Sequence, residues 1–214
     1  MLKKIKIYKK NQDCKGNFYM NTEENILKTT YELLLEKRNL NISMSEICKK
    51  SNNSPGTIYY HFKNKEELIK ATLTKYIINV YFNQISYFKI LQGTTFDKIK
   101  YCYNIALNFN QDIKINDNDL NKFLLLILQS KEKYPDLFLK YTKVKSSFNK
   151  VLNNIISEGI KNDELKNDLD VEKIVDIIKK DINGIFFTKY LNDTEDIEKL
   201  TNYSFALTWN YIKK

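Results

Sequence analysis

SPGTIYYHFKNKEEL, residues 54–68, contains a helix start, a very short helix, a stop and a second helix start within fifteen residues. Ser54 is a good N-cap, and Pro55 at the first helical position loses no hydrogen bond, because an N–H there has no helical partner. Gly56 lets another surface approach the start of the short helix. Asn64 can cap the second helix, and Glu67 three residues later completes a capping-box pattern.

The short helix has only two residues to bury, Ile58 and Phe62, at spacing i and i+4. Four side chains with polar tips are left facing outward: Thr57, Tyr59, Tyr60 and His61. A helix that anchors one thin face and displays hydrogen-bonding groups on the other is suited to contact another molecule. DNA is the main candidate.

The preceding residues complete a helix-turn-helix pattern. Residues 24–37 read as an amphipathic helix, and we expect Asn39 or Asn41 to end it in the left-handed conformation. Ser43 is a plausible cap for a second short helix over residues 44–50, with Glu46 at its third position. Residues 51–53 then form the turn that such a motif requires.

Residues 22–68 resemble the DNA-binding domain of the tetracycline-repressor (TetR) family of bacterial transcription regulators, and its multidrug-binding branch in particular. The similar run extends from Gly56 to Leu68, whereas the rest of the chain resembles the family mainly in its helix layout. Asn52 and Asn53 stand where Gly and Val are usual, and Thr30 stands where Ala is common. Asn52 can still adopt the left-handed conformation.

The resemblance implies an all-α protein of about nine helices in two domains. Residues 21–68 would form the three-helix DNA-binding domain, and residues 69–214 a helical ligand-binding and dimerisation domain. Residues 1–20 are a basic extension with a net charge of +5, out of +9 for the chain. This extension is either an arm that assists DNA binding, a disordered tail, or the product of an upstream start.

The expected DNA interface has an unusual composition, because its recognition helix contains neither Arg nor Lys. Bidentate arginine contacts with guanine are the commonest specific base contacts. Base reading therefore falls on Thr57, Tyr59, Tyr60 and the Gly56 backbone, with thymine contacts favoured. The alternatives are a partly buried ring for Tyr59 and a helix C-cap for His61. The full set of expected DNA-binding residues is Ser43, Ser45, Ser54, Pro55, Gly56, Thr57, Tyr59, Tyr60, His61, Lys63 and Lys65.

The chain after residue 64 reads as helices throughout. We expect them over residues 65–91, 95–111, 120–131, 135–158 and 171–191, followed by a last helix to residue 213. Gly159 would end the fourth of these, Thr95 would cap the second, and Asp193 or Thr194 would cap the last.

Aromatic residues are dense in this body, since the chain has 12 Phe, 15 Tyr and one Trp. Pockets lined by aromatic rings hold apolar or cationic small molecules. The alternative role for each ring is ordinary core packing. Asp181 is a candidate partner for a cationic ligand, although pairing with a nearby lysine is the simpler interpretation. The candidate pocket residues are Tyr101, Tyr103, Phe109, Phe123, Tyr134, Phe148, Asp181 and Phe186.

The last two expected helices carry apolar stripes, and pairing with their copies would form a four-helix dimer interface. The small Gly184 would allow close approach of helices. The candidate interface residues are Ile178, Ile182, Gly184, Ile185, Leu200, Ser204, Leu207 and Tyr211.

Other function classes receive little support. One His and no Cys-x-x-Cys argue against a metal site, and no cofactor motif or catalytic constellation is visible. Three unpatterned cysteines fit a reducing cytoplasm, and no apolar run approaches the ~18 residues of a membrane helix. The sequence predicts a cytoplasmic, homodimeric, non-enzymatic repressor that binds a palindromic double-stranded DNA operator. A small, largely apolar or aromatic inducer would release it from the operator. A cationic inducer is the more specific form of this hypothesis. The alternative is a ligand-independent structural or nucleoid-associated DNA-binding protein, and a cavity of several hundred Å³ would favour the sensor.

Overall fold

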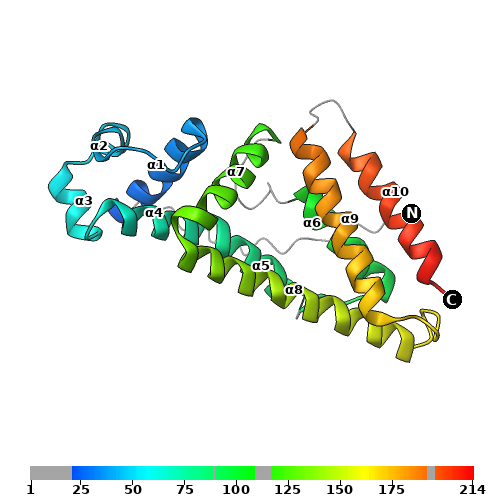
Figure 1. Ribbon diagram of the computed structural model, residues 1–214. Coiled ribbons are helices and arrows are strands. Elements are labelled where there is room, and N and C mark those ends of the chain that lie inside the picture. Colours follow the sequence, from blue (N-terminus) through cyan, green and yellow to red (C-terminus); the bar gives the residue numbers. More distant parts are fainter. Residues whose placement is uncertain (1–20, 89, 109–116, 192–195) are drawn as a thin grey trace, which may run out of the picture.

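The computed structural model describes residues 21–88, 90–108, 117–191 and 196–214, which form an elongated helical molecule (Figure 1). A small head of three helices lies at one end and a larger helical body at the other. These described residues form ten α-helices and one π-helical turn, or nine helices when the continuous helix over 65–87 is counted once. The expected all-α fold class is confirmed.

The head consists of α1 (Thr22–Lys37), α2 (Met44–Ser51) and α3 (Pro55–His61). The helices α2 and α3 begin at the expected caps, whereas α1 begins at Thr22, two residues before the expected start. The Ser43 side chain accepts a hydrogen bond from the Glu46 backbone N–H, and Ser54 accepts one from Thr57. Asn52 ends α2 with φ of 54°, the left-handed conformation that asparagine tolerates.

The end of α1 differs from the sequence prediction, and the cause is tertiary. Arg38, rather than Asn39 or Asn41, takes the left-handed conformation, with φ of 52°. Gln129 in α7 (Asp117–Lys133) donates its amide N–H to the Arg38 carbonyl at 3.0 Å and accepts the Leu40 N–H at 2.9 Å. The body therefore fixes the turn that follows α1.

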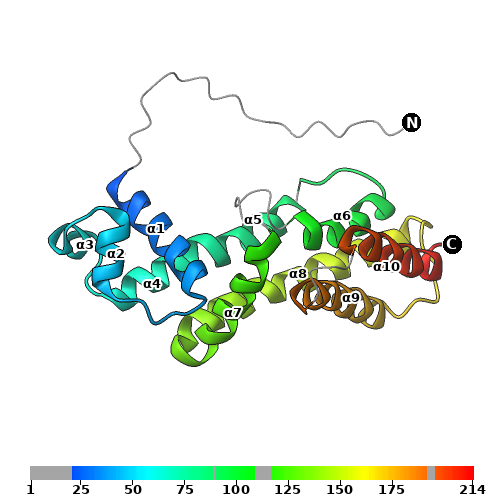
Figure 2. The ribbon, with the colours of Figure 1, turned by 90° about the horizontal axis from the view of Figure 1, so that it is seen from above.

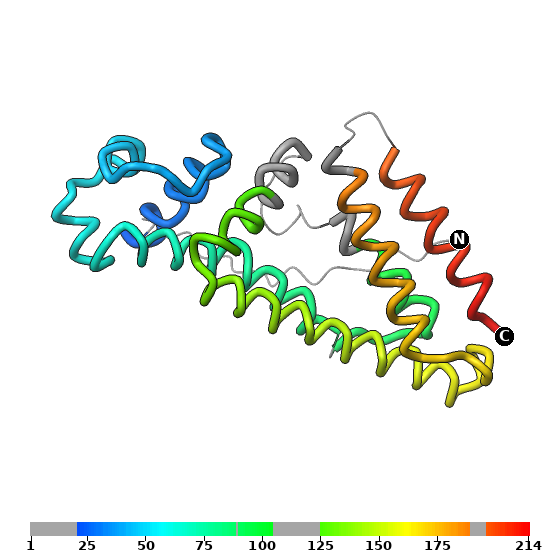
Figure 3. The backbone as a smooth tube through the Cα atoms, viewed as in Figure 1, coloured from blue at the N-terminus to red at the C-terminus, as the bar shows by residue number. Residues whose placement is uncertain are grey.

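One continuous rod connects the head with the body, as the backbone tube in Figure 3 shows. It comprises α4 (Lys65–Leu73), the π-helical turn η1 (Thr74–Ile78) and α5 (Asn79–Tyr87). The Asn79 N–H bonds to the Thr74 carbonyl five residues earlier, which is the π-helical spacing. The sequence pattern predicts the rod but not this turn, and the rod ends at Tyr87 rather than near residue 91.

The rest of the body comprises α6 (Thr95–Asn108), α7, α8 (Pro135–Lys161), α9 (Val171–Leu191) and α10 (Ile197–Ile212). Seen from above, α9 and α10 lie side by side at the end far from the head (Figure 2). Asp196 caps α10, because its carboxylate accepts the Lys199 N–H at 2.9 Å. The expected caps Asp193 and Thr194 lie outside the described residues.

Gly159 does not end α8, which continues to Lys161. A Cβ atom at Gly159 would come within 2.8 Å of both Thr95 and Leu165, so the glycine permits close packing inside the helix. Thr95 is likewise not the cap of α6. Its backbone N–H and hydroxyl instead donate to the Glu164 carboxylate at 2.9 and 3.0 Å.

Two apolar clusters hold the molecule together. The first joins the head and the rod to α7 and α8, through residues such as Leu126 and Leu137. The second packs α6, α8, α9 and α10 against one another. The predicted domain boundary between residues 68 and 69 falls within α4. None of the described helices is long and apolar enough to cross a membrane.

Candidate nucleic-acid interface and ligand cavity

The helix α3 anchors one thin face and exposes the rest. Ile58 is completely buried and Phe62 is 5% exposed, so these two side chains attach the helix to the head. Tyr59 and Tyr60 are 50% and 85% exposed. The ring of His61 meets that of Tyr60 edge to face, with centroids 5.1 Å apart. Two tyrosines with little to contact on the protein side therefore dominate this surface.

The first turn of α3 leaves space beside its backbone. A Cβ atom at Gly56 would meet only the Ser54 hydroxyl oxygen, at 3.7 Å. The head's own packing does not require glycine here, and an external surface could come close to the backbone. The hydroxyl oxygens of Ser54 and Thr57 lie 2.9 Å apart, so each can exchange this hydrogen bond for one with an incoming group.

The residues expected to contact phosphate lie around α3, and they differ in whether their side chains already have partners within the protein. Ser45, Lys63 and Lys65 form no ion pair or side-chain hydrogen bond within the described part of the chain. The Ser43 hydroxyl, by contrast, donates to the Glu46 carboxylate at 2.9 Å. An ion pair with Lys37 and hydrogen bonds from Ser43 lower the pKa of Glu46 to about 2. A phosphate at Ser43 would compete with this carboxylate.

Side-chain contacts connect the rod to α8 of the body and to α1 of the head. Lys70 pairs with Glu66 at 2.8 Å and with Asp136 in α8 at 3.1 Å. Tyr76 of η1 stacks on Tyr31 of α1, with ring centroids 4.7 Å apart and planes 10° apart. The orientation of the head is therefore coupled to the position of the rod.

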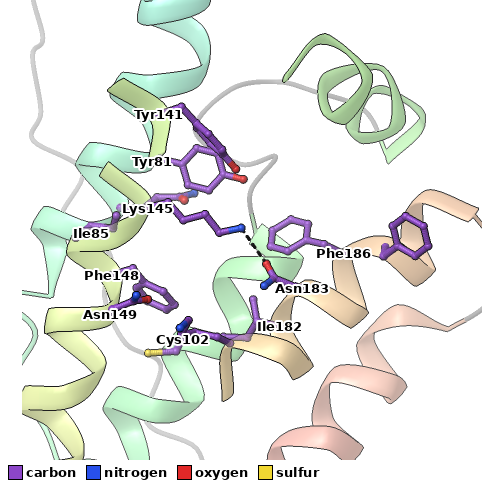
Figure 4. Close-up of a pocket in the computed structure, with 13 residues that line it drawn as sticks. Tyr81, Ile85, Cys102, Tyr141, Lys145, Phe148, Asn149, Ile182, Asn183 and Phe186 are labelled. Carbon is purple, nitrogen blue, oxygen red and sulfur yellow. Dashed lines mark hydrogen bonds between the residues drawn. The ribbon is translucent and has the colours of Figure 1, made fainter. Parts of the chain in front are cut away.

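A cavity opens inside the body between the rod and helices α6, α8 and α9 (Figure 4). Its volume is about 170 Å³, and it is open to solvent on one side. This volume is smaller than the several hundred Å³ expected for a sensor, and it resembles the ~150 Å³ cavity that accommodates benzene. The lining is mostly apolar and is formed by Tyr81, Gln84, Ile85, Cys102, Tyr141, Lys145, Phe148, Asn149, Lys179, Ile182, Asn183, Phe186 and Phe187.

Polar groups occupy a few positions on this wall. The Tyr81 and Tyr141 rings meet at 75° with centroids 5.3 Å apart, and burial raises the pKa of both hydroxyls. Lys145 extends from α8 toward Asn183 on α9, as Figure 4 shows, with Nζ 3.3 Å from the amide oxygen. Burial raises the pKa of the Cys102 thiol, so this cysteine is protonated at neutral pH.

Comparison with known proteins identifies the head. Residues 26–72 match the family of bacterial regulatory proteins called the tetR family. This match covers α2 and α3, most of α1 and the beginning of the rod. Residues 26–72 therefore form a DNA-binding domain of the TetR family.

Solved structures extend the likeness in fold from the head to the body. A TetR transcription regulator from Haloarcula marismortui has a TM-score of 0.73 at 18% identity, over 90% of this chain and 98% of that one. FadR from Bacillus subtilis, crystallised in complex with stearoyl-CoA, has a TM-score of 0.65 at 22% identity, over 86% and 96%. The fatty acid metabolism regulator protein of Bacillus subtilis is 24% identical over 179 residues, which cover 83% of this chain and 88% of the relative.

The structure brings two of the expected pocket residues, Phe148 and Phe186, to the cavity wall. Tyr101 contacts Tyr87 and Phe88 instead, and Tyr134 is buried where the head meets the body. Phe109 and the side chain of Phe123 lie outside the described residues.

Asp181 forms no ion pair with a lysine within the described part of the chain. It faces away from the cavity and accepts hydrogen bonds from the hydroxyls of Tyr103 at 2.9 Å and Thr208 at 3.3 Å. Tyr103 is completely buried and also lies outside the cavity lining. These three side chains join α9, α6 and α10, so their role in the structure is packing between helices.

The expected dimer residues divide into two groups. Ile178, Ile182 and Ile185 are buried within one chain, because the apolar stripe of α9 packs on its own body rather than outward. Leu200 and Ser204 are half-buried. Gly184, Leu207 and Tyr211 are exposed, with Leu207 at 55% and Tyr211 at 61%. Ile177 of α9 and Tyr203 of α10 are also exposed and were not among the expected residues.

Most cavity residues were not predicted from the sequence, although their spacing is helical. Tyr141, Lys145 and Phe148 follow the i, i+4, i+7 pattern, as do Lys179, Asn183 and Phe186. That spacing identifies a shared face on each helix. Which faces meet around a space depends on tertiary packing, which the spacing does not contain.

Proposed function

We propose that this protein is a transcriptional repressor that binds a DNA operator through α3 and is released when a small molecule enters the body. The observation that carries the proposal is the exposed surface of α3 within a TetR-family domain. Tyr59 and Tyr60 project from it, Gly56 leaves its first turn open, and Lys63 and Lys65 flank it. Tyrosine rings and threonine methyl groups suit thymine methyl groups, whereas lysines neutralise phosphates.

The ligand-responsive part of the proposal is supported by the cavity and by a relative. FadR from Bacillus subtilis has this fold and was crystallised with stearoyl-CoA. A ligand in the present cavity would contact α5, because Tyr81, Gln84 and Ile85 form part of its wall. Since α5 continues through η1 into α4, displacement of α5 would reorient the head. Release then follows from a difference in ligand affinity between two arrangements of the rod.

The proposal includes a cytoplasmic, non-enzymatic homodimer. Relatives of this chain are regulators, which supports a regulatory rather than a catalytic role. Exposed apolar side chains on α9 and α10 supply a surface for a second copy. Two copies would place two α3 helices in successive major grooves of a palindromic site, about 34–36 Å apart. The alternative, a ligand-independent structural DNA-binding protein, has no use for a cavity beside the rod.

Two substitutions test the DNA-binding role. An operator is first selected from random duplexes with the purified protein, and binding is then measured at two salt concentrations. Lys65→Ala should weaken binding to operator and random DNA alike and reduce the salt slope by about one, because it removes one phosphate contact. Tyr59→Ala should lose affinity for the operator and retain its affinity for random DNA, because it removes a base contact.

The matched control is Lys49→Ala, which removes an exposed lysine of α2 outside the expected interface. Its binding should equal that of the unmodified protein. Equal losses on both DNAs for Tyr59→Ala would remove Tyr59 from base reading. Failure of the selection to enrich any palindrome would count against a site-specific regulator.

A further inference from the structure

Lys145 places an unneutralised positive charge on the cavity wall. Its ammonium group approaches the Asn183 amide oxygen at 3.3 Å, and it forms no ion pair with a carboxylate of the described residues. Figure 4 shows the side chain crossing the cavity between the two tyrosines and Phe148. The residue is accessible through the open side of the cavity, so a ligand could reach it.

A second lysine makes this charge less favourable. Lys179 lines the same cavity from α9, and its ammonium pairs with Asp176 at 2.8 Å. Partial desolvation of its ammonium group in the cavity, followed by the charge of Lys179, lowers the pKa of Lys145, although the side chain as a whole is exposed. An anion placed beside Lys145 would offset both effects and favour the charged ammonium group, because it supplies an opposite charge next to it.

Gln84 provides an independent sign that a polar group is missing. It lies on the cavity wall and is only 8% exposed, and its amide oxygen has no hydrogen-bond partner among the described residues. A buried amide oxygen without a partner is costly. Rotation of the amide by 180° exchanges its oxygen for its NH₂ group, so Gln84 can accept from a ligand or donate to one.

We infer that the cavity binds an apolar molecule bearing one anionic group, which accepts hydrogen bonds from Lys145 and from the Gln84 amide. This inference rests on the proposed function and names its ligand class. The apolar part packs on Phe148, Ile182 and Phe186, and a longer tail leaves through the open side. The charge is opposite to the cation expected from the sequence, because Asp181 faces away from the cavity whereas Lys145 faces it.

A matched series of probes tests the sign of the charge. Decanoate, 1-decanol and decyltrimethylammonium share a ten-carbon chain and differ in head group, and decanoyl-CoA adds a larger anionic one. Binding to the full-length protein is measured by calorimetry. Decanoate or decanoyl-CoA should bind at least about tenfold more tightly than decanol, and the cation should bind most weakly. Preference for one of the two anions would identify a free carboxylate or a coenzyme A thioester as the source of the charge.

Substitutions connect this preference to the residues. Lys145→Gln should weaken decanoate binding about tenfold and leave decanol binding unchanged, whereas the matched control Lys143→Gln, an exposed lysine on α8, should change neither. Gln84→Leu should also weaken binding of the anion, and thermal unfolding shows whether each variant is folded.

Three results would overturn the inference: decanol binding as tightly as the anions, no binding by either anion, or unchanged affinity of Lys145→Gln for the anion that the unmodified protein prefers. Release of the selected operator is measured in parallel. Anion binding without operator release would uphold the inference and count against the proposed ligand-responsive repression.

Discussion

At the scale of single residues, two buried threonines form an informative pair. Thr30 in α1 is completely buried, and its hydroxyl has no hydrogen-bond partner in the described part of the chain. Thr72 in α4 is equally buried, but its hydroxyl donates to the Leu68 carbonyl at 2.8 Å. A buried hydroxyl without a partner destabilises the folded state, whereas a bonded one does not. In the TetR-family pattern that this part of the chain resembles, alanine is common at the position of Thr30.

Replacing each threonine by valine should therefore change stability in opposite directions. Thr30→Val keeps the shape and removes the unbonded hydroxyl, so the free energy of unfolding should rise by about 1 kcal/mol. Thr72→Val loses a hydrogen bond and should lower it by up to about 1 kcal/mol. Urea denaturation measures both, and equal destabilisation of the two variants would contradict the assignment of Thr30 as unsatisfied.

At the scale of helices, the beginnings of α2, α3 and α4 were predictable, whereas the caps of α6 and α10 and several helix ends were not. Ser43, Ser54 and Asn64 cap their helices as expected, because a cap is a local contact between a side chain and the next turn. The end of α1 depends on Gln129, and the continuation of α8 past Gly159 depends on packing against Thr95 and Leu165. These contacts join residues far apart in the sequence, so local patterns do not contain them.

The candidate site likewise has one part that was predictable from local sequence, the surface of α3, and one that was not, the cavity. The exposed residues of α3 follow from the spacing of Ile58 and Phe62 and from its caps, which are all within a few residues. The cavity requires faces of four helices, α5, α6, α8 and α9, to meet. The sequence prediction therefore placed the carboxylate of Asp181 in the pocket, whereas Lys145 and Lys179 are the charged residues that line the cavity.

The cap of α2 should be sensitive to acid. The pKa of Glu46 is lowered from 4.5 to about 2, chiefly by Lys37 and then by Ser43. Because the folded-state pKa is depressed, the contribution of Glu46 to stability is present above about pH 4.5 and is lost as the pH falls through about 2. An NMR titration should show this low pKa, and Lys37→Met should raise it. A wild-type value near 4.5 would contradict the ion pair.

At the scale of the whole molecule, the exposed side chains of α9 and α10 indicate how two copies would meet. Ile177, Tyr203, Leu207 and Tyr211 are exposed by 44% to 62%, although all are large and apolar. A Cβ atom at Gly184 would meet nothing within 4 Å, so a second copy has room to approach this part of α9 closely. We expect the dimer interface at these residues rather than at the buried stripe of α9.

A charge on this surface should separate the copies. Leu207→Glu and Gly184→Glu should each sediment as a folded monomer, because a carboxylate would be buried without a partner at the interface. Lys150→Glu introduces the same side chain on an exposed position of α8 and should remain a dimer. Operator affinity of the monomers should fall roughly 10²-fold or more, since the two half-sites no longer act together. A dimer in both variants would place the interface elsewhere.

The π-helical turn η1 gives the rod a particular tolerance to changes in chain length. Each residue of an α-helix turns the chain by about 100°, and η1 accommodates one residue more than an α-helical turn over the same stretch. A version of this chain that lacks one residue within Thr74–Ile78 could therefore form an unbroken α-helix. Leu68 would still face the head and Tyr81 the cavity. A deletion of one residue from α5 before Tyr81 would lack this compensation if η1 persisted, and the cavity wall would turn away by about 100°. A one-residue deletion within Thr74–Ile78 would therefore preserve the orientation of the DNA-facing end of the rod relative to its ligand-facing end.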